Sequence, residues 1–256
     1  MLAVRLRRIA VIVAVAAAVT GITSSAPAGF GTAVSAPFSW GGVSWCPNYY
    51  GSQSWETCGA PTPSGTASSA AFYPSQVSYT TSSAPISLEM NAAATESGAF
   101  NSNSETQDTW SAPATLSEEI NLPCDGSVIE NWPAFWLVTT GSWPKGGEID
   151  VMEGLGGQAE WHYHYLGAHG VDSQVGGSLG SGCGTNYYGV KWTTSEIIFY
   201  YNGVAVGAVT SKEIGVSIAS GPMFLVNDYA ASSDYGGPTV GGVSMEVFNL
   251  TATIQS

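Results

Sequence analysis

Residues 132–153 read WPAFWLVTTGSWPKGGEIDVME, and this segment decides how the chain is expected to fold. Its first part, through Val138, is a short aromatic and aliphatic run typical of a β-strand. A turn-forming stretch follows, with Gly141, Pro144 and two further glycines. The last part begins at Glu148 and alternates polar with apolar residues. The segment therefore predicts two strands joined by a turn, with three acids concentrated on the second strand.

The three acids are Glu148, Asp150 and Glu153, and the pleat of a strand determines which of them share a face. Alternate side chains of a regular strand point the same way, so Glu148 and Asp150 share one face while Glu153 has the opposite parity. A β-bulge in which Val151 and Met152 together occupy one step returns Glu153 to the face of Glu148. We therefore expect a bulge at these two residues and one face that carries all three carboxylates.

Three carboxylates on one face repel one another, and this repulsion can serve catalysis. Like charges close together raise the pKa of one acid, so one group keeps a proton while another stays ionised. Glycoside hydrolysis requires such a pair. The flanking side chains of Trp132, Trp136 and Trp143 are apolar plates on which sugar rings can stack. A solvated acidic strand face and a calcium site made of the same oxygens are the alternatives, and clustered aromatics suit a sugar better than a hydrated ion.

Strand-like runs recur along the rest of the chain. They are rich in β-branched and aromatic residues and lie at 86–90, 134–138, 148–152, 160–165, 196–201, 223–226 and 243–250. Asn202-Gly203 separates two of these apolar segments and suits the type I′ turn of a β-hairpin. Helix patterns are scarce, so the sequence predicts an all-β sandwich or barrel of antiparallel strands.

The N-terminus has the pattern of a secretory signal peptide. Three arginines precede an apolar run from Ile9 to Val19, which is shorter than the roughly 20 residues that span a bilayer. We expect a signal peptide over 1–28, with cleavage as late as 36, followed by a single catalytic domain over 37–256. The expected location is extracellular, the protein being secreted and having no stable membrane anchor.

Charge narrows the expected partners. The chain has 6 lysines and arginines against 19 acids, for a net charge of −13. Such a chain repels phosphate and sulfate polymers, so we expect no nucleic-acid partner, and sulfated polysaccharides are disfavoured as well. A neutral ligand is favoured.

Four cysteines in an exported chain predict two disulfides. Proximity suggests Cys46 with Cys58, which leaves Cys124 with Cys183, although three pairings are open. A zinc site made of the four thiolates lacks the usual paired short spacings. Three histidines without short metal-binding spacing give a histidine metal site little support.

The motifs Trp132-Pro-Ala-Phe-Trp-Leu137 and Gly147-Glu-Ile-Asp-Val-Met-Glu153 resemble glycoside hydrolase family 16, in its bulged, laminarinase-like branch. The resemblance extends more loosely from about Phe72 to the C-terminus. It implies a concanavalin-like β-jelly-roll sandwich of two antiparallel sheets with a concave substrate cleft. It also implies a retaining, endo-acting mechanism, with Glu148 as nucleophile, Asp150 as the acid that orients and tunes it, and Glu153 as acid/base.

The same resemblance implies how substrate is held and what it is. Three tryptophans bound the sugar subsites, and His164 and Asn227 are further contact candidates. We expect a monomer that needs no cofactor or metal, without an indicated role for structural calcium, and that hydrolyses neutral β-1,3 or mixed-linkage β-glucan. One departure is the strand at 118–122, which lacks an arginine that the family often carries there.

Several alternatives remain open. A galactanase or transglycosylase would use the same scaffold with different loops. A non-catalytic carbohydrate-binding protein would keep the fold and the aromatic residues. A structural wall or spore-coat protein would have no affinity for saccharides.

Overall fold

The structure is a computed structural model that describes residues 32–33, 38–40, 42–47, 71–79, 85–91, 93–102, 108–231 and 235–254. The expected signal peptide and Cys58 lie outside the described residues. Strands dominate the described part, and helix is confined to the short segments η1 (Pro74–Gln76) and α1 (Ser211–Ile214). Neither of these is long enough to cross a membrane.

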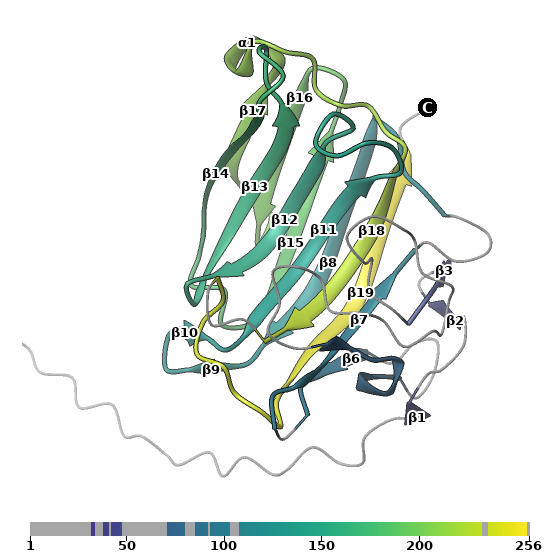
Figure 1. The fold of residues 1–256 in the computed structure, drawn as a ribbon, viewed down its shortest axis with the longest axis vertical. Helices are drawn as coiled ribbons and strands as arrows, with labels where there is room; N and C mark the ends of the chain where they lie inside the picture. The colour runs from purple at the N-terminus through teal and green to yellow at the C-terminus, as the bar shows by residue number, and fades with distance from the viewer. Residues whose placement is uncertain are drawn as a thin grey trace, which may run out of the picture.

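Two large sheets form the body of the molecule (Figure 1). We call the first the front sheet; its strands in spatial order are β14 (Asp172–Gly180), β13 (Gln158–Leu166), β12 (Glu148–Leu155), β11 (Trp132–Thr139), β18 (Met223–Ala230), β7 (Glu96–Asn101) and β4 (Ala71–Phe72). All neighbours in it are antiparallel except β4 and β7.

The back sheet lies behind the front sheet in Figure 1. Its strands in spatial order are β1 (Thr32–Ala33), β5 (Val77–Tyr79), β6 (Ile86–Glu89), β19 (Ser244–Ile254), β8 (Ala114–Leu122), β15 (Gly184–Trp192), β16 (Glu196–Tyr201) and β17 (Val204–Thr210). Two small hairpins accompany the sheets: β2 (Phe38–Trp40) with β3 (Val43–Trp45), and β9 (Cys124–Asp125) with β10 (Val128–Ile129).

The main hydrophobic core fills the space between the sheets. Alternate residues of each strand point into it, as the strict alternation of buried and half-buried residues along β8 illustrates. Phe135 and Ile149 of the front sheet join the same fully buried cluster as Leu116 and Phe199 of the back sheet. The prediction of an all-β sandwich of antiparallel sheets is confirmed.

The predicted strand runs are all present, with bounds that extend several of them by a few residues. The predicted hairpin is also present, because Asn202 and Gly203 both have positive φ and join β16 to β17. The sequence did not predict β14, whose glycine-rich residues lack an apolar alternation. Its side chains are mostly exposed or half-buried, as expected for a strand at the edge of the front sheet.

The predicted bulge lies where the parity of the acids required it. On β12, Asp150 pairs with His162 and Glu153 pairs with Glu160, so three steps on β12 face two steps on β13. Val151 and Met152 are both fully buried beneath this irregular step. The extra residue is therefore accommodated by the core, and the parity of β12 changes between Asp150 and Glu153.

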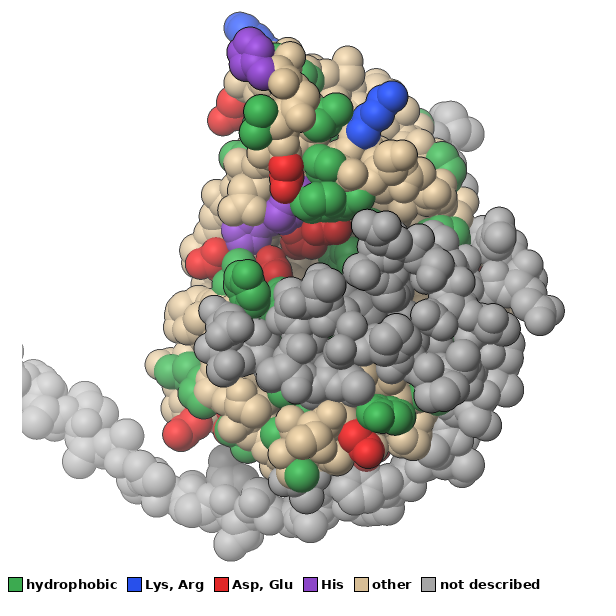
Figure 2. All heavy atoms as spheres, in the orientation of Figure 1, with side chains coloured by type: hydrophobic (Ala, Val, Ile, Leu, Met, Phe, Trp, Pro, Cys, Tyr) green, Lys and Arg blue, Asp and Glu red, His purple; other side chains and the backbone are tan. Residues whose placement is uncertain are grey.

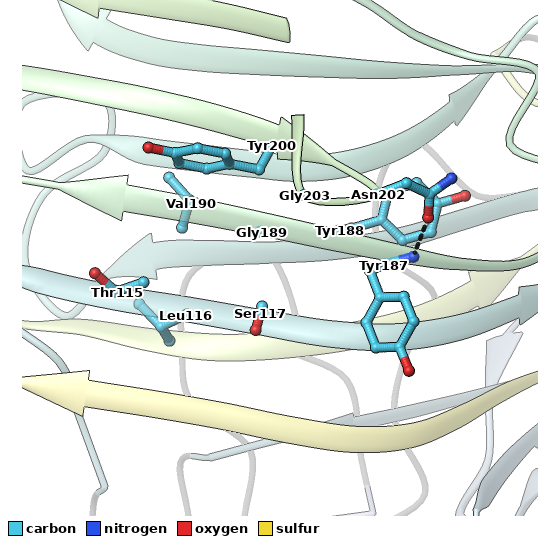
Figure 3. A pocket seen from close by; sticks show the side chains of 10 residues that line it. All are labelled: Thr115, Leu116, Ser117, Tyr187, Tyr188, Gly189, Val190, Tyr200, Asn202 and Gly203. Carbon is cyan, nitrogen blue, oxygen red and sulfur yellow. Dashed lines mark hydrogen bonds between the residues drawn. The ribbon is translucent and has the colours of Figure 1, made fainter. Parts of the chain in front are cut away.

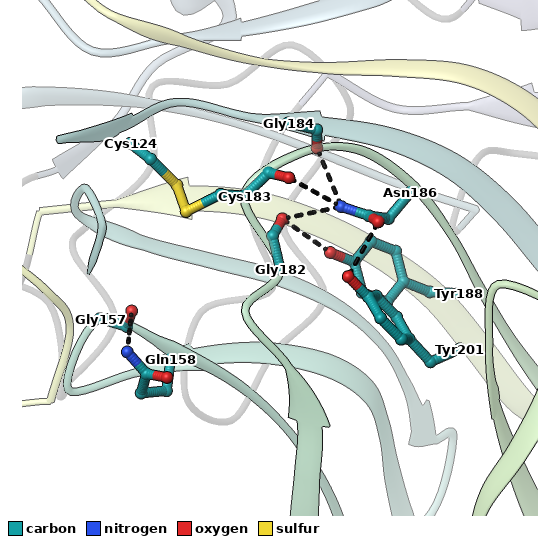
Figure 4. Close-up of a disulfide and its surroundings, with 9 residues drawn as sticks. All are labelled: Cys124, Gly157, Gln158, Gly182, Cys183, Gly184, Asn186, Tyr188 and Tyr201. Carbon is teal, nitrogen blue, oxygen red and sulfur yellow. Dashed lines mark hydrogen bonds between the residues drawn. A yellow bond between two sulfur atoms is a disulfide. The ribbon is translucent and has the colours of Figure 1, made fainter. Parts of the chain in front are cut away.

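Cys124 and Cys183 form a disulfide with a Cα–Cα distance of 5.8 Å, as predicted (Figure 4). It joins β9 to the segment that leads into β15. Beside it, the Asn186 amide donates hydrogen bonds to the carbonyls of Gly182, Cys183 and Gly184. The pairing of Cys46 with Cys58 stays a prediction, because Cys58 lies outside the described residues.

Candidate active site

The three acids of β12 lie together on the outer face of the front sheet, and we call Glu148, Asp150 and Glu153 the acidic cluster. Figure 2 shows acidic and histidine side chains gathered with apolar side chains on this face. The side chains of Glu148, Asp150 and Glu153 retain 18%, 7% and 15% of their exposure, respectively. The cluster is therefore recessed but still reachable from solvent.

Two histidines of β13 interleave with the cluster. His162 Nδ1 lies 3.2 Å from Glu153 Oε2, and His164 Nε2 lies 3.3 Å from Asp150 Oδ2 and 3.8 Å from Glu148 Oε1. His162 has room because its partner on β14 is Gly176, where a side chain would collide with the imidazole ring. The two histidines share one face of β13, and it is the face of the acids.

Burial and mutual repulsion raise the pKa values within the cluster. Burial is the main cause that raises the pKa of Glu148 well above its usual value, and the charge of Asp150 adds to it. Burial likewise raises the pKa of Asp150 well above its usual value, with a further contribution from Glu153. Against this rise, His164 and a hydrogen bond from Trp143 act to lower the pKa of Glu148. The cluster therefore favours a mixed state in which one carboxyl is protonated and another ionised.

Aromatic side chains surround the acids. Trp132 Nε1 donates a hydrogen bond of 3.0 Å to Glu153 Oε1, and its ring stacks on Tyr235 with centroids 5.3 Å apart. Trp143 is 47% exposed, with its ring centroid 6.1 Å from that of His164. The structure thus brings these two tryptophans to the acidic cluster, with Trp143 as the more exposed plate.

Trp136 is nearly buried, in a small cluster on the outer face of β11 and β18. Its Nε1 donates a hydrogen bond of 2.8 Å to Asp228 Oδ2. Burial raises the pKa of Asp228 to about 7, with Glu153 adding to the rise. Sequence reasoning missed Asp228, although its parity with the outward Val226 on an otherwise apolar strand was a usable signal.

The expectation that Asn227 contacts substrate is wrong. Asn227 is fully buried, and its amide donates a hydrogen bond of 3.1 Å to Glu118 Oε1 of the back sheet. Its parity on β18 places it on the inner face, whereas its neighbour Asp228 lies on the outer face.

Two sets of side chains have ligand atoms within 4.8 Å of one another: Glu148 with Asp150 and His164, and Asp150 with Glu153 and His162. Such oxygens and nitrogens can hold a divalent cation. Both sets consist of the acidic cluster and its histidines. A bound cation would therefore occupy the carboxylate oxygens that a reaction at an anomeric carbon would need.

The acidic cluster, flanked by tryptophans on the outer face of a two-sheet β-sandwich, has the paired carboxyls that glycoside hydrolysis uses. Residues 79–176 match the family model described as the XgeA-like, catalytic GH16 domain. The match covers less than half of the chain, so the chain is similar to glycoside hydrolase family 16 over this segment, which contains the acidic cluster.

Curated relatives match the central part of the chain. The endo-1,3-1,4-beta-glycanase ExsH of Rhizobium meliloti (strain 1021) is 30% identical over 128 residues, which cover 47% of this chain and 25% of that relative. The keratan-sulfate endo-1,4-beta-galactosidase of Sphingobacterium multivorum is 34% identical over 83 residues, covering 28% of this chain and 19% of that relative. The aligned parts thus span a quarter or less of these relatives.

Solved structures share the fold. The glycoside hydrolase family 16 endo-glucanase from Bacteroides ovatus has a TM-score of 0.61 at 18% identity, covering 82% of this chain and 94% of that chain. The laminarinase catalytic domain from Thermotoga maritima has a TM-score of 0.58 at 15% identity, covering 74% of this chain and 84% of that chain.

Proposed function

We propose that this chain is a secreted, retaining endo-glycosidase that hydrolyses β-1,3 or mixed-linkage β-glucan. The observation that carries the proposal is the shared outer face of Glu148 and Glu153, which a bulge at Val151 and Met152 produces. Glu153 is close enough to Glu148 to contribute to the rise in the pKa of Glu148. Glycoside hydrolysis uses two carboxyl groups that flank the bond to be cut.

In the first step, the Glu148 carboxylate attacks the anomeric carbon and the glycosidic C–O bond breaks. The leaving oxygen takes a proton from Glu153. In the second step, Glu153 removes a proton from water, whose oxygen attacks the same carbon and releases Glu148. Each step inverts the anomeric centre, so the product retains the configuration of the substrate.

Asp150 and the histidines prepare the two glutamates for these roles. Asp150 is the most deeply buried of the three acids, and burial raises its pKa well above the usual value, which favours its protonated form. His164 and Trp143 favour the ionised form of Glu148. Trp132 and His162 hold the carboxyl of Glu153 in place through its two oxygens.

The aromatic surroundings and the charge of the chain support a neutral glucan as substrate. The rings of Trp132, Tyr235 and Trp143 offer apolar faces beside the acids. A net charge of −13 disfavours anionic polymers. Relatives named endo-1,3-1,4-beta-glycanase and glucan endo-1,3-beta-glucosidase support the same choice.

Release of reducing ends from laminarin, a soluble β-1,3-glucan, tests this function. Glu148→Gln and Glu153→Gln keep the shape of the side chains but remove the nucleophile or the acid/base, so each should lower turnover by at least about 100-fold. Glu196→Gln, a change on the back sheet, is the matched control and should retain activity. A Glu148 or Glu153 variant with unchanged turnover would remove that residue from its role.

The pattern of failures separates the alternatives. A protein that binds laminari-oligosaccharides in a thermal-shift assay but hydrolyses no glucan would be a carbohydrate-binding protein. Product sizing on a panel of β-glucans and neutral galactans identifies the linkage and distinguishes endo from exo action. Unchanged rates after treatment with EDTA would argue against a cation in the acidic cluster.

A further inference from the structure

The back sheet carries a hollow on its outer face, on the side away from the front sheet (Figure 3). Its volume is about 530 Å³, and strands β8, β15 and β16 contribute most of its lining. Gly189 lies at its centre, paired with Ser117 on one side and Tyr200 on the other. Because Gly189 has no side chain, the floor between these two neighbours stays open; an added Cβ would lie 3.2 Å from the Cβ of Ser117.

Two tyrosine rings border this hollow. Figure 3 shows Tyr187 and Tyr200 on either side of the Gly189 backbone. Tyr187 is 53% exposed, so its ring is accessible to a ligand in the hollow.

Hydrogen bonds hold Tyr187 in position. Its backbone N–H donates a bond of 2.9 Å to Asn202 Oδ1, and its direct partner on β8 is Glu119, whose carboxylate raises the pKa of the Tyr187 phenol. Glu119 in turn accepts a bond of 2.7 Å from the Asn249 amide of β19. These bonds hold the backbone of Tyr187 and the carboxyl of Glu119 beside it, so the exposed ring extends from a fixed part of the sheet.

The chemistry of the lining indicates the kind of ligand. All ten lining residues are uncharged, although the chain as a whole has a net charge of −13. Aromatic faces lie beside the hydroxyls of Thr115, Ser117 and Tyr200. This lining offers no charged partner to a charged ligand. A purely apolar ligand would leave the polar groups of the lining unused. A sugar ring, with apolar faces and hydroxyl edges, matches both features.

We propose that this hollow is a second binding site for a neutral polysaccharide chain, separate from the acidic cluster on the opposite side of the sandwich. The class of ligand rests on the proposed function. A polymer that reaches both sites holds the protein with a higher effective concentration of chain at the acidic cluster, whereas a short oligosaccharide occupies one site at a time. The second site therefore matters for long or insoluble glucan and not for short fragments.

The test measures retention on insoluble β-1,3-glucan in a Glu148→Gln background, so that no chain is cut during binding. Replacing both rings, with Tyr187→Ala and Tyr200→Ala, should lower retention by about tenfold, from the usual contribution of two aromatic contacts. Tyr187→Phe with Tyr200→Phe keeps both rings and is the matched control, which should retain binding. With Glu148 intact, the alanine variant should hydrolyse laminari-oligosaccharides at an unchanged rate.

Retention that is equal in the alanine and phenylalanine variants would overturn the second site. A loss of short-oligosaccharide hydrolysis in the alanine variant would overturn it as well, because the two sites would then not be separate. The second site would also be overturned if the parent protein were a dimer and the alanine variant a monomer, because the hollow would then bind a second copy of the chain. If the unmodified protein neither binds nor hydrolyses any glucan, both proposals fail; if only the tyrosine comparison fails, the proposed function stands.

Discussion

Single carboxyl groups in this protein differ mainly in how deeply they are buried. Glu118 is the extreme case outside the acidic cluster, since it lies between the two sheets and, among the described residues, has only the Asn227 amide as a hydrogen-bond partner. Burial raises its pKa from the usual 4.5 to about 8, which the Asn227 hydrogen bond partly opposes. A protonated Glu118 can donate to Asn227 Oδ1 while accepting from Nδ2, so one proton would give partners to two buried oxygens that otherwise have none.

This buried acid predicts a pH dependence of stability. Because the pKa of Glu118 is higher in the folded protein than in the unfolded chain, the folded state binds the extra proton between pH 4.5 and about 8. The contribution is fully present below pH 4.5 and is lost as pH rises to about 8, at up to roughly 1.4 kcal/mol per pH unit. Urea unfolding of Glu118→Gln against the parent should show a smaller loss of stability over this window.

Glu119→Gln is the control for that comparison, since Glu119 lies on the outer face of the same strand. It should leave the slope of stability against pH close to that of the parent. Parallel slopes for Glu118→Gln and the parent would show that Glu118 is ionised in the folded protein.

The acids of the candidate site could be found from sequence, as could their neighbours Trp132, Trp143 and His164. Spacing and parity located Glu148, Asp150 and Glu153, because strand periodicity is local. Asn227 was expected to contact substrate and Asp228 was missed, since the face to which a residue points depends on how its strand packs against the second sheet.

At the scale of elements, the bulge in β12 and the order of the strands determine the site. Local parity predicted the bulge, because an acid at position 153 would otherwise point into the core. The sequence did not predict that β11 pairs with β18, because the two strands are far apart in the chain. The strand β14 was missed because its glycines serve packing against β13, as at Gly176 beneath His162.

The disulfide that follows β8 predicts a measurable stabilisation. Cys124 and Cys183 are 59 residues apart, and closing a loop of this length stabilises a protein by about 4 kcal/mol in the chain-entropy model. Replacing both with alanine should lower the free energy of unfolding by ~2–4 kcal/mol. Denaturant titration measures the change, with the activity on laminarin at low temperature preserved because the bond lies away from the acidic cluster. A stability equal to that of the parent would show that the bond constrains little of the unfolded chain.

At the scale of the whole molecule, charge and composition predicted the class of ligand before any geometry was known. The net charge of −13 predicts discrimination against anionic glycans. Sulfated laminarin should be hydrolysed at least about tenfold more slowly than laminarin at low salt, and added NaCl should narrow the gap by screening. Equal rates on both polymers at low salt would show that the overall charge does not select the substrate.

The strand signals predicted an all-β sandwich or barrel, and the resemblance to glycoside hydrolase family 16 implied the two-sheet sandwich, whereas the hollow at Gly189 was not predicted. Tyr187 and Tyr200 lie in different strands, and their placement around Gly189 depends on the register of β8, β15 and β16. Overall charge acts at long range and can be counted from the sequence. A binding surface assembled from three strands requires the folded sheet.

The most direct measurement of the central claim is covalent trapping of the nucleophile. A β-glucan oligosaccharide with a 2-deoxy-2-fluoro sugar and a dinitrophenyl leaving group should form a glycosyl-enzyme that hydrolyses slowly, because fluorine destabilises the oxocarbenium-like transition state. Peptide mass spectrometry is predicted to place one glycosyl adduct on Glu148, with none in Glu148→Gln. An adduct on Glu153, or release of dinitrophenol without any adduct, would contradict the assignment of Glu148 and Glu153 as nucleophile and acid/base.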